Sequence, residues 1–182
     1  MVKAVSVSLG GLALLLLGAC AYIQHPKFGA HPKGERLERI VRSPHYADGV
    51  FHNTVDTPVL VEGVSTLSVV VGNLLDPGEN RRPAQPLPRV DSDLSALNGD
   101  GDRIIWLGHS SYFLRFAGKR ILIDPVLSDY AAPVSFSTRA FPGTSLFTAE
   151  EMPEVDLLLI THDHWDHLDH ATLSTLMPKV DE

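Results

Sequence analysis

The fold of this chain is decided between residues 156 and 170, where the sequence reads DLLLITHDHWDHLDH. The apolar first part predicts a strand, and the polar part follows at its carboxyl end, where α/β enzymes place their reactive groups. Four side chains of metal-ligand type fall within six positions: His162, His164, Asp166 and His167. Neutral imidazoles and carboxylates suit zinc, and they also suit iron or manganese. The stretch therefore predicts a metal site on a tight loop.

The spacing of these ligands indicates two metal ions rather than one. On a tight loop, His162 and His164 can point toward one ion together. Asp166 and His167 can then reach a neighbouring ion. Two ions about 3.5–4 Å apart can act together in a displacement at phosphorus or carbon. We assign the catalytic role within the motif to Asp166.

Two further residues of the stretch, Asp169 and His170, are expected to support the ligands or to face the substrate. The alternative for the whole stretch is a solvated histidine-rich loop. A chance match to this spacing is on the order of one in a thousand for a chain with nine histidines. A metal site is therefore the preferred interpretation.

The rest of the C-terminal half alternates strands with turns. Apolar runs predict strands at residues 104–107, 112–116, 120–124 and 156–161. Residues 117–119 read as a short hairpin turn, and Pro125 ends the third strand. A helix is predicted over 171–177, with Pro178 ending it. The fold class is therefore α+β.

The N-terminus has the pattern of a secretory signal. Lys3 precedes an apolar run at residues 5–17, which is about the length of a signal-peptide core. Leu17-Gly18-Ala19-Cys20 then resembles a bacterial lipobox, in which Cys20 receives the lipid. We expect a lipid-anchored protein of the bacterial cell envelope, in the outer membrane if the source is Gram-negative, because Ala21 is not the Asp that favours inner-membrane retention. An ordinary signal peptide or an uncleaved anchor is the alternative.

The segment between the lipobox and the first predicted strand is harder to interpret. Residues 67–71 could form a strand or part of a helix, and their periodicity does not decide. Four prolines make residues 76–89 an extended connector. Residues 98–102 resemble a calcium loop, but Arg103 and His109 stand where that loop needs Gly and Glu. A turn is expected there.

Composition excludes several classes of protein. The chain has 182 residues, 44% hydrophobic residues and a net charge of -7, which fits a globular domain. No nucleic-acid partner is expected, because no Lys/Arg cluster forms a basic face. A single cysteine excludes an internal disulfide and a cysteine-based zinc cluster. The oligomeric state stays open.

Residues 162–167 match the signature of the metallo-β-lactamase superfamily. Three stretches carry a closer resemblance, WLGHSS at 106–111, ILIDPVLS at 121–128 and THDHWDHLDH at 161–170. With the FHN at 51–53, they resemble the branch that contains N-acylphosphatidylethanolamine-hydrolysing phospholipase D and its bacterial relatives. The resemblance implies an αββα sandwich with the metals at one edge, and two zinc ions.

The resemblance also implies roles for individual residues. It makes His162 and His164 ligands of one metal, and Asp166 and His167 ligands of the other. Asp124 resembles a buried acid that braces the metal loop, with an N-cap or turn acid as the alternative. His109 lines the site or is a hydrogen-bonded histidine at a strand end.

The implied activity is that of a metal-dependent hydrolase. A phospholipase D-like phosphodiesterase acting on a phospholipid is the leading interpretation. A lactonase-type hydrolase is the alternative within the family.

Members of this family take further metal ligands from segments downstream of the motif. Only residues 168–182 follow it here. We therefore predict a fragment: a signal peptide (1–19), an extension with its connector (20–98), and a partial metallo-β-lactamase domain (99–182) whose second half is missing. Its two-zinc site would be incomplete, so the chain alone is expected to be inactive. A membrane-anchored, inactive lipoprotein remnant and complementation by another chain are the alternatives.

Overall fold

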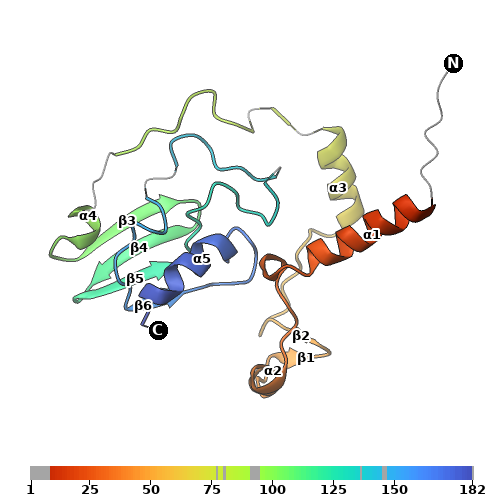
Figure 1. Cartoon of the computed structure of the whole chain (residues 1–182), viewed down its shortest axis with the longest axis horizontal. Coiled ribbons are helices and arrows are strands. Elements are labelled where there is room, and N and C mark those ends of the chain that lie inside the picture. The colour runs from red at the N-terminus through yellow and green to blue at the C-terminus, as the bar shows by residue number, and fades with distance from the viewer. Residues whose placement is uncertain are drawn as a thin grey trace. The chain divides into compact units, whose positions relative to one another are not determined.

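The computed structural model describes residues 9–76, 78–79, 81–90, 95–135, 137–144 and 147–181 (Figure 1). The chain divides into two compact units, Met1–Gly29 with Pro83–Glu182, and Ala30–Arg82. Part of the predicted signal peptide, including Lys3, lies outside the described residues.

The first unit is built on a four-stranded mixed sheet in the order β3-β4-β5-β6. Its strands are β3 (Arg103–Gly108), β4 (Ser111–Phe116), β5 (Lys119–Ile123) and β6 (Leu157–Leu159). The first three pair antiparallel, while β6 lies parallel to β5. All four predicted strands are present, and the α+β fold class is confirmed.

Two local details set the shape of this sheet. Ala117 (φ 49°) and Gly118 (φ 79°) form the predicted turn between β4 and β5, where Phe116 pairs with Lys119. Positive φ at both positions is typical of a two-residue hairpin, because its twist matches that of the strands. The fourth strand is shorter than predicted. Thr161 leaves the ladder because its N–H donates to the Asp124 side chain instead.

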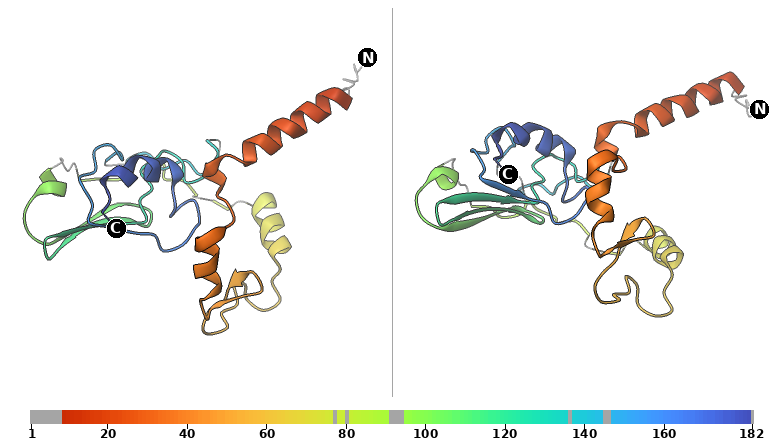
Figure 2. Two further views of the ribbon diagram at one scale, coloured as in Figure 1. Left: turned by 60° about the horizontal axis from the view of Figure 1, so that its bottom comes forward. Right: turned by 90° about the horizontal axis from the view of Figure 1, so that it is seen from below.

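One face of the sheet is covered by helix α5 (His170–Leu176), which continues into the 3₁₀ turn η2 (Met177–Lys179). Figure 2 shows α5 lying over the sheet together with the long connection between β5 and β6. The helix occupies nearly the predicted range. The core beneath it is apolar and consists of Leu97, Leu107, Phe113, Leu122, Phe147, Ala149, Met152, Val155 and Leu176.

The opposite face of the sheet is also apolar, but it is open. Strand residues that alternate with the core positions are exposed here: Ile104, Trp106, Tyr112, Phe116 and Leu159. A sheet that is apolar on both faces reads as a nearly continuous hydrophobic run, which is how these strands appear in the sequence.

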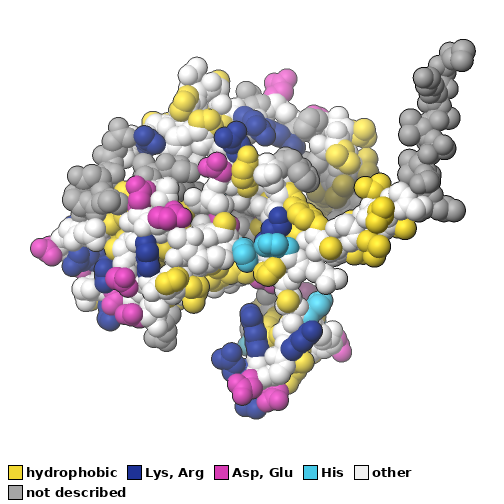
Figure 3. All heavy atoms as spheres, viewed as in Figure 1, with side chains coloured by type: hydrophobic (Ala, Val, Ile, Leu, Met, Phe, Trp, Pro, Cys, Tyr) yellow, Lys and Arg dark blue, Asp and Glu magenta, His cyan; other side chains and the backbone are white. Residues whose placement is uncertain are grey.

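The remaining elements of the first unit are helical. Helix α1 (Leu9–Ile23) carries Cys20, which is exposed, and is followed by the 3₁₀ turn η1 (Pro26–Phe28). Figure 3 shows the hydrophobic side chains along α1, which include the exposed Leu14 to Leu17. Among the described residues, no helix combines the length and the apolar character needed to cross a membrane. A short helix, α4 (Ser95–Asn98), precedes β3 through a turn at 99–102, as expected.

The second unit contains helix α2 (Gly34–Val41), strands β1 (Tyr46–Ala47) and β2 (Val50–Phe51), and helix α3 (Thr66–Leu75). The segment 67–71, left open by its periodicity, is therefore helical. The capping box formed by Ser65 and Ser68 starts this helix, since each side chain accepts a hydrogen bond from the other's backbone N–H. None of the described residues of this unit is buried.

Candidate metal centre

Three connections of the first unit converge at one edge of its sheet. The turn between β3 and β4 supplies His109, the residue after β5 supplies Asp124, and the loop after β6 supplies residues 161–169. Since β5 and β6 are parallel neighbours, their carboxyl ends meet at the same edge. His109 (φ 43°) and Asp124 (φ 42°) both adopt the left-handed backbone conformation that non-glycine residues rarely take. Strained positions of this kind cluster at functional sites.

Asp124 holds the histidine loop in place through hydrogen bonds to Thr161 and His167. Its side chain is buried, at 3% exposure. Its Oδ1 accepts a hydrogen bond from the Thr161 N–H at 2.7 Å. Its Oδ2 accepts from the Thr161 hydroxyl at 2.7 Å and lies 2.8 Å from His167 Nδ1. No helix begins at this residue, so the geometry is that of a brace rather than an N-cap.

The electrostatics keep the Asp124 carboxyl ionised. Burial alone would raise its pKa, but the hydrogen bonds from His167 and Thr161 outweigh burial and lower the pKa below its ordinary value. An ionised carboxylate only accepts hydrogen bonds, so His167 must carry its proton on Nδ1. In the neutral ring, the other nitrogen, Nε2, then has a free lone pair.

This orientation of His167 is the one that metal-binding histidines adopt, with one nitrogen held by a carboxylate and the other free for the ion. His167 Nε2 lies 3.9 Å from Asp166 Oδ2. Its side chain is 15% exposed, so ring rotation is restricted by packing as well as by Asp124. The residues present therefore fit a metal ion on the Nε2 side of the ring.

Asp166 and His109 complete the group on that side. His109 Nε2 lies 3.0 Å from Asp166 Oδ2, and the His109 and His167 ring centroids are 5.4 Å apart. One ligand atom from each of His109, Asp166 and His167 can be chosen so that all lie within 4.8 Å of one another. Burial would raise the pKa of Asp166, but hydrogen bonds from its own backbone and from His109 outweigh this and lower it. The group thus combines two imidazoles with an ionised carboxylate.

The other two predicted ligands lie beside this group. The His162 ring centroid is 3.9 Å from that of His167 and 4.6 Å from that of His164. His162 Nδ1 is 3.0 Å from the Thr161 hydroxyl, which leaves its Nε2 available. The structure therefore brings all four predicted ligands together at one edge of the sheet. His109, for which lining the site and being a hydrogen-bonded strand-end histidine were the alternatives, lies with its Nε2 3.0 Å from Asp166 Oδ2.

Asp169 and His170 take positions outside the imidazole cluster. Asp169 is buried and caps helix α5, accepting hydrogen bonds from the N–H groups of Ala171 and Thr172. The ring of His170 lies 5.8 Å from that of His25. Both residues line a pocket, and neither of the two roles predicted for this pair, support of the ligands or a place on the substrate side, is tested by this placement.

Sequence reasoning left Thr161 and Ser111 without a role. Thr161 donates two hydrogen bonds to Asp124, and the buried Ser111 hydroxyl donates to the Asp124 carbonyl and accepts from the Val126 N–H. Both lie inside the stretches that carry the family resemblance, which was the available signal. Their function depends on a partner in another connection, so the local pattern did not reveal it.

Nitrogen and oxygen donors of this kind suit zinc, iron or manganese, and thiolate-preferring sites are excluded because no cysteine lies near the cluster among the described residues. A divalent ion bound by such ligands acts as a Lewis acid. The arrangement can therefore support hydrolytic chemistry at the edge of the sheet.

Comparison with known proteins agrees with this geometry. Residues 103–181 match the family model described as a β-lactamase superfamily domain. The match begins at β3 and includes the whole sheet, the histidine loop and α5. It therefore covers every residue of the candidate centre.

Relatives with similar sequences extend the comparison. An uncharacterized protein of Mycobacterium tuberculosis is 35% identical over 140 residues, which are 75% of this chain and 37% of that protein. A UPF0173 metal-dependent hydrolase of Caldivirga maquilingensis is 42% identical over 66 residues, 36% of this chain and 23% of the relative. The N-acyl-phosphatidylethanolamine-hydrolyzing phospholipase D 1 of Caenorhabditis elegans is 34% identical over 64 residues, 35% of this chain and 18% of the enzyme.

The chain thus spans 37% of the length of the mycobacterial relative and less of the other two. The family match and the convergence of His109, Asp124, Asp166 and His167 rest on the same 79-residue segment. Residues 103–181 of this chain form a β-lactamase superfamily domain.

Proposed function

We propose that this protein is a zinc-dependent hydrolase that cleaves a phosphodiester bond of a phospholipid. The observation that carries the proposal is the Asp124-braced His167, whose free nitrogen faces the ionised Asp166 and His109. The relatives named as a metal-dependent hydrolase and as a phospholipase D support the class of reaction and the substrate. The chain spans only part of these relatives, so the proposal concerns the reaction to which this centre contributes.

The residues of the centre have separate tasks. His162, His164, Asp166 and His167 would hold the metal, with His109 at its side. Bound zinc would supply Lewis-acid chemistry at the phosphodiester. Asp124 keeps the proton of His167 on Nδ1, so that Nε2 stays free. The low pKa of Asp166 keeps its carboxylate charged, which favours the cation and disfavours an anionic competitor.

We also propose that the protein is attached to the bacterial envelope through a lipid on Cys20. This cysteine is exposed on α1, and apolar side chains surround it on the same helix. The outer membrane is the expected location in a Gram-negative cell. Cys20→Ser should abolish lipid-dependent processing and move the protein out of the membrane fraction. Unchanged partitioning of the variant would contradict the anchor.

The function is tested by metal analysis and lipid hydrolysis with the same preparation. The dialysed chain, loaded with zinc, iron or manganese in turn, is incubated with N-acylphosphatidylethanolamine in mixed micelles, and the phosphatidic acid formed is measured. Zinc-dependent turnover that His167→Ala abolishes would support the proposal. A lactone substrate forms the parallel arm. Turnover of the lactone alone would favour the lactonase alternative.

Metal binding without any turnover is the third outcome. It would favour an inactive, membrane-anchored metal-binding lipoprotein over an enzyme. Asp163→Asn is the matched control variant, because Asp163 is an exposed acid in the same loop. Its turnover should equal that of the unchanged chain.

A further inference from the structure

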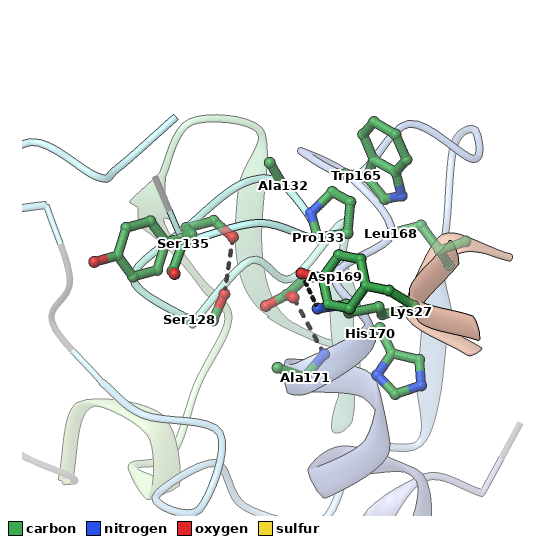
Figure 4. A pocket seen from close by; sticks show the side chains of 12 residues that line it. Lys27, Ser128, Ala132, Pro133, Ser135, Trp165, Leu168, Asp169, His170 and Ala171 are labelled. Carbon is green, nitrogen blue, oxygen red and sulfur yellow. Dashed lines mark hydrogen bonds between the residues drawn. The ribbon is translucent and has the colours of Figure 1, made fainter. Parts of the chain in front are cut away.

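A pocket of about 270 Å³ is lined in part by residues of the histidine loop. Three segments of the first unit line it: Tyr22 and Lys27 from the end of α1 and from η1, Ser128 and Tyr130 from the connection after β5, and Trp165 and His170 from the histidine loop and α5. Figure 4 shows these segments facing one another. None of the metal ligands predicted from the motif lines this pocket.

The Lys27 ammonium supplies a positive charge to the pocket. Among the described residues that line the pocket, Lys27 is the single Lys or Arg, and it is half-buried. Its ammonium donates a hydrogen bond to the Tyr22 hydroxyl at 2.9 Å and lies 4.3 Å from the centre of the Tyr22 ring. An ammonium has three N–H donors. Among the described residues, one of them is used, by the Tyr22 hydroxyl, which leaves two for a ligand. A half-buried cation loses hydration, and an anion in the pocket would restore what is lost.

The acid among the described lining residues, Asp169, is hydrogen-bonded to helix α5, whereas Lys27 is hydrogen-bonded to Tyr22. The Asp169 carboxylate is buried and accepts hydrogen bonds from two N–H groups of α5 and from the Thr172 hydroxyl. These partners occupy its oxygens and orient it toward the helix. Hydroxyl groups of Ser128 and Tyr130 and the ring of His170 add neutral polar surface. The polar part of the pocket therefore fits a singly charged anion with several oxygen acceptors.

The rest of the lining is apolar. Trp165, Leu168, Ala132 and Pro133 supply apolar surface to the pocket (Figure 4). Trp165 is 46% exposed, a large apolar surface left open to a ligand. Pockets that combine an apolar wall with a few placed polar groups are typical of small-molecule sites. The ligand should thus carry an anion at one end and an apolar body at the other.

The position of this pocket in the chain ties it to the membrane. Tyr22 is two residues and Lys27 is seven residues after Cys20. Seven extended residues span at most roughly 25 Å, and a part of this segment is helical and shorter. A lipid on Cys20 would therefore hold the pocket next to the headgroups of the bilayer. Its Trp165 belongs to the loop that carries the metal ligands.

We propose that this pocket binds the phosphate group of a membrane phospholipid, with Lys27 recognising the phosphate and Trp165 contacting the glycerol and upper acyl part. The choice of a lipid phosphate rests on the proposed function. The recognition itself needs no metal. The pocket would select phosphate-bearing lipids at the surface and bring them beside the metal centre.

Binding is measured without metal, so that the centre does not contribute. The chain has two tryptophans, and Trp106→Phe leaves Trp165 as the reporter. This variant, in EDTA, is titrated with dihexanoyl phosphatidylglycerol below its micelle concentration. We expect a saturable change in Trp165 fluorescence. Lys27→Met in the same background should weaken binding about ten- to hundred-fold, the range for loss of a charge-assisted hydrogen bond.

Two further ligands identify the source of the phosphate. Dihexanoylglycerol has the apolar body without the phosphate, and inorganic phosphate has the anion without the body. Each should bind at least about ten-fold more weakly than the phospholipid, because each lacks one of the two recognised parts. Equal binding of inorganic phosphate, or equal binding of dihexanoylglycerol, would overturn the proposal.

Lys33→Met is the matched control, since Lys33 is an exposed lysine that does not line the pocket. Calorimetric titration of the chain with both tryptophans intact repeats the measurement if Trp106→Phe lowers the folded fraction. If the Lys27→Met variant binds the phospholipid with the same affinity as the Lys33→Met variant, the site is refuted. Phospholipid hydrolysis that is unaffected by Lys27→Met would also refute it while leaving the proposed function standing. Metal-free phospholipid binding without hydrolysis would support the phosphate site and count against the proposed hydrolase function.

Discussion

Asp124→Asn should separate metal binding from folding at the candidate centre. The carboxylate of Asp124 accepts three hydrogen bonds, from the N–H and hydroxyl of Thr161 and from His167 Nδ1. An asparagine retains one acceptor oxygen for the Thr161 N–H and presents an NH₂ group to the other two partners. The Thr161 hydroxyl can rotate and accept, because a hydroxyl both donates and accepts. His167 can pair with the NH₂ group only if Nδ1 becomes an acceptor.

That change moves the proton of His167 to Nε2, the nitrogen that faces Asp166. A protonated Nε2 has no lone pair for a metal ion, so the ligand is lost although the ring stays in place. Zinc affinity should fall about 10- to 100-fold, the usual effect of removing the partner that orients a ligand histidine. Stability without metal should fall by about 1–3 kcal/mol, the cost of one mismatched buried hydrogen-bonding group.

Zinc affinity is measured by competition with a chromogenic chelator, and stability by urea unfolding in EDTA. Asp163→Asn, in the same loop but exposed, is the control and should leave both quantities unchanged. Unaltered zinc affinity in the Asp124 variant would refute the argument that Asp124 sets the proton position of His167. A loss of stability with no loss of affinity would reduce Asp124 to a purely structural brace.

Three further outcomes are expected. Asp156→Asn should remove a pH-dependent part of the free energy of unfolding. The reason is that hydrogen bonds from the Arg120 N–H and the Lys119 ammonium lower the pKa of the Asp156 carboxyl to about 2. The difference in free energy of unfolding between the variant and the unchanged chain should be full above about pH 4 and vanish as the pH falls toward 2. Urea unfolding at a series of pH values tests this. A difference that grows on acidification would contradict it. Phe113→Ala should cost about 3–5 kcal/mol because Phe113 is fully buried, whereas Phe116→Ala, on the open face at 62% exposure, should cost far less; equal unfolding midpoints would be evidence against this core. His167→Ala should remove most of the zinc retained after dialysis, as measured by elemental analysis, and retention equal to that of the Asp163→Asn control would show that the metal is held elsewhere.

Local patterns predicted most of the sheet correctly. The runs at 104–107 and 112–116 became β3 and β4, because apolar strand residues and a two-residue turn act within a few positions of each other. The segment 67–71 was open because an apolar run fits a strand or a helix equally well. The capping box at Ser65 and Ser68, which lies just before and within this run, decides for the helix.

The candidate centre divides in the same way. The types and spacing of His162, His164, Asp166 and His167 were evident from the sequence, since all four sit on one loop and converge by local geometry. For Asp124 and His109 the family resemblance implied roles, but their partners His167 and Asp166 could not be read from local pattern, because these pairs are separated by 43 and 57 residues in sequence. The pocket lined by Lys27 and Trp165 could not be predicted from local pattern, because these two residues are 138 positions apart in the sequence and line one pocket only in the folded chain.

The amino-acid sequence by itself determined the metal-ligand loop, the strand before it and the family to which the domain belongs. Tertiary structure alone decided which nitrogen of His167 is free, which histidine joins Asp166, and which lysine faces the adjoining pocket. The physical reason is the range of the interactions. Strand, turn and loop geometry follow from neighbouring residues, whereas hydrogen bonds between β3, β5 and the histidine loop exist only after the strands have paired and brought their ends to one edge.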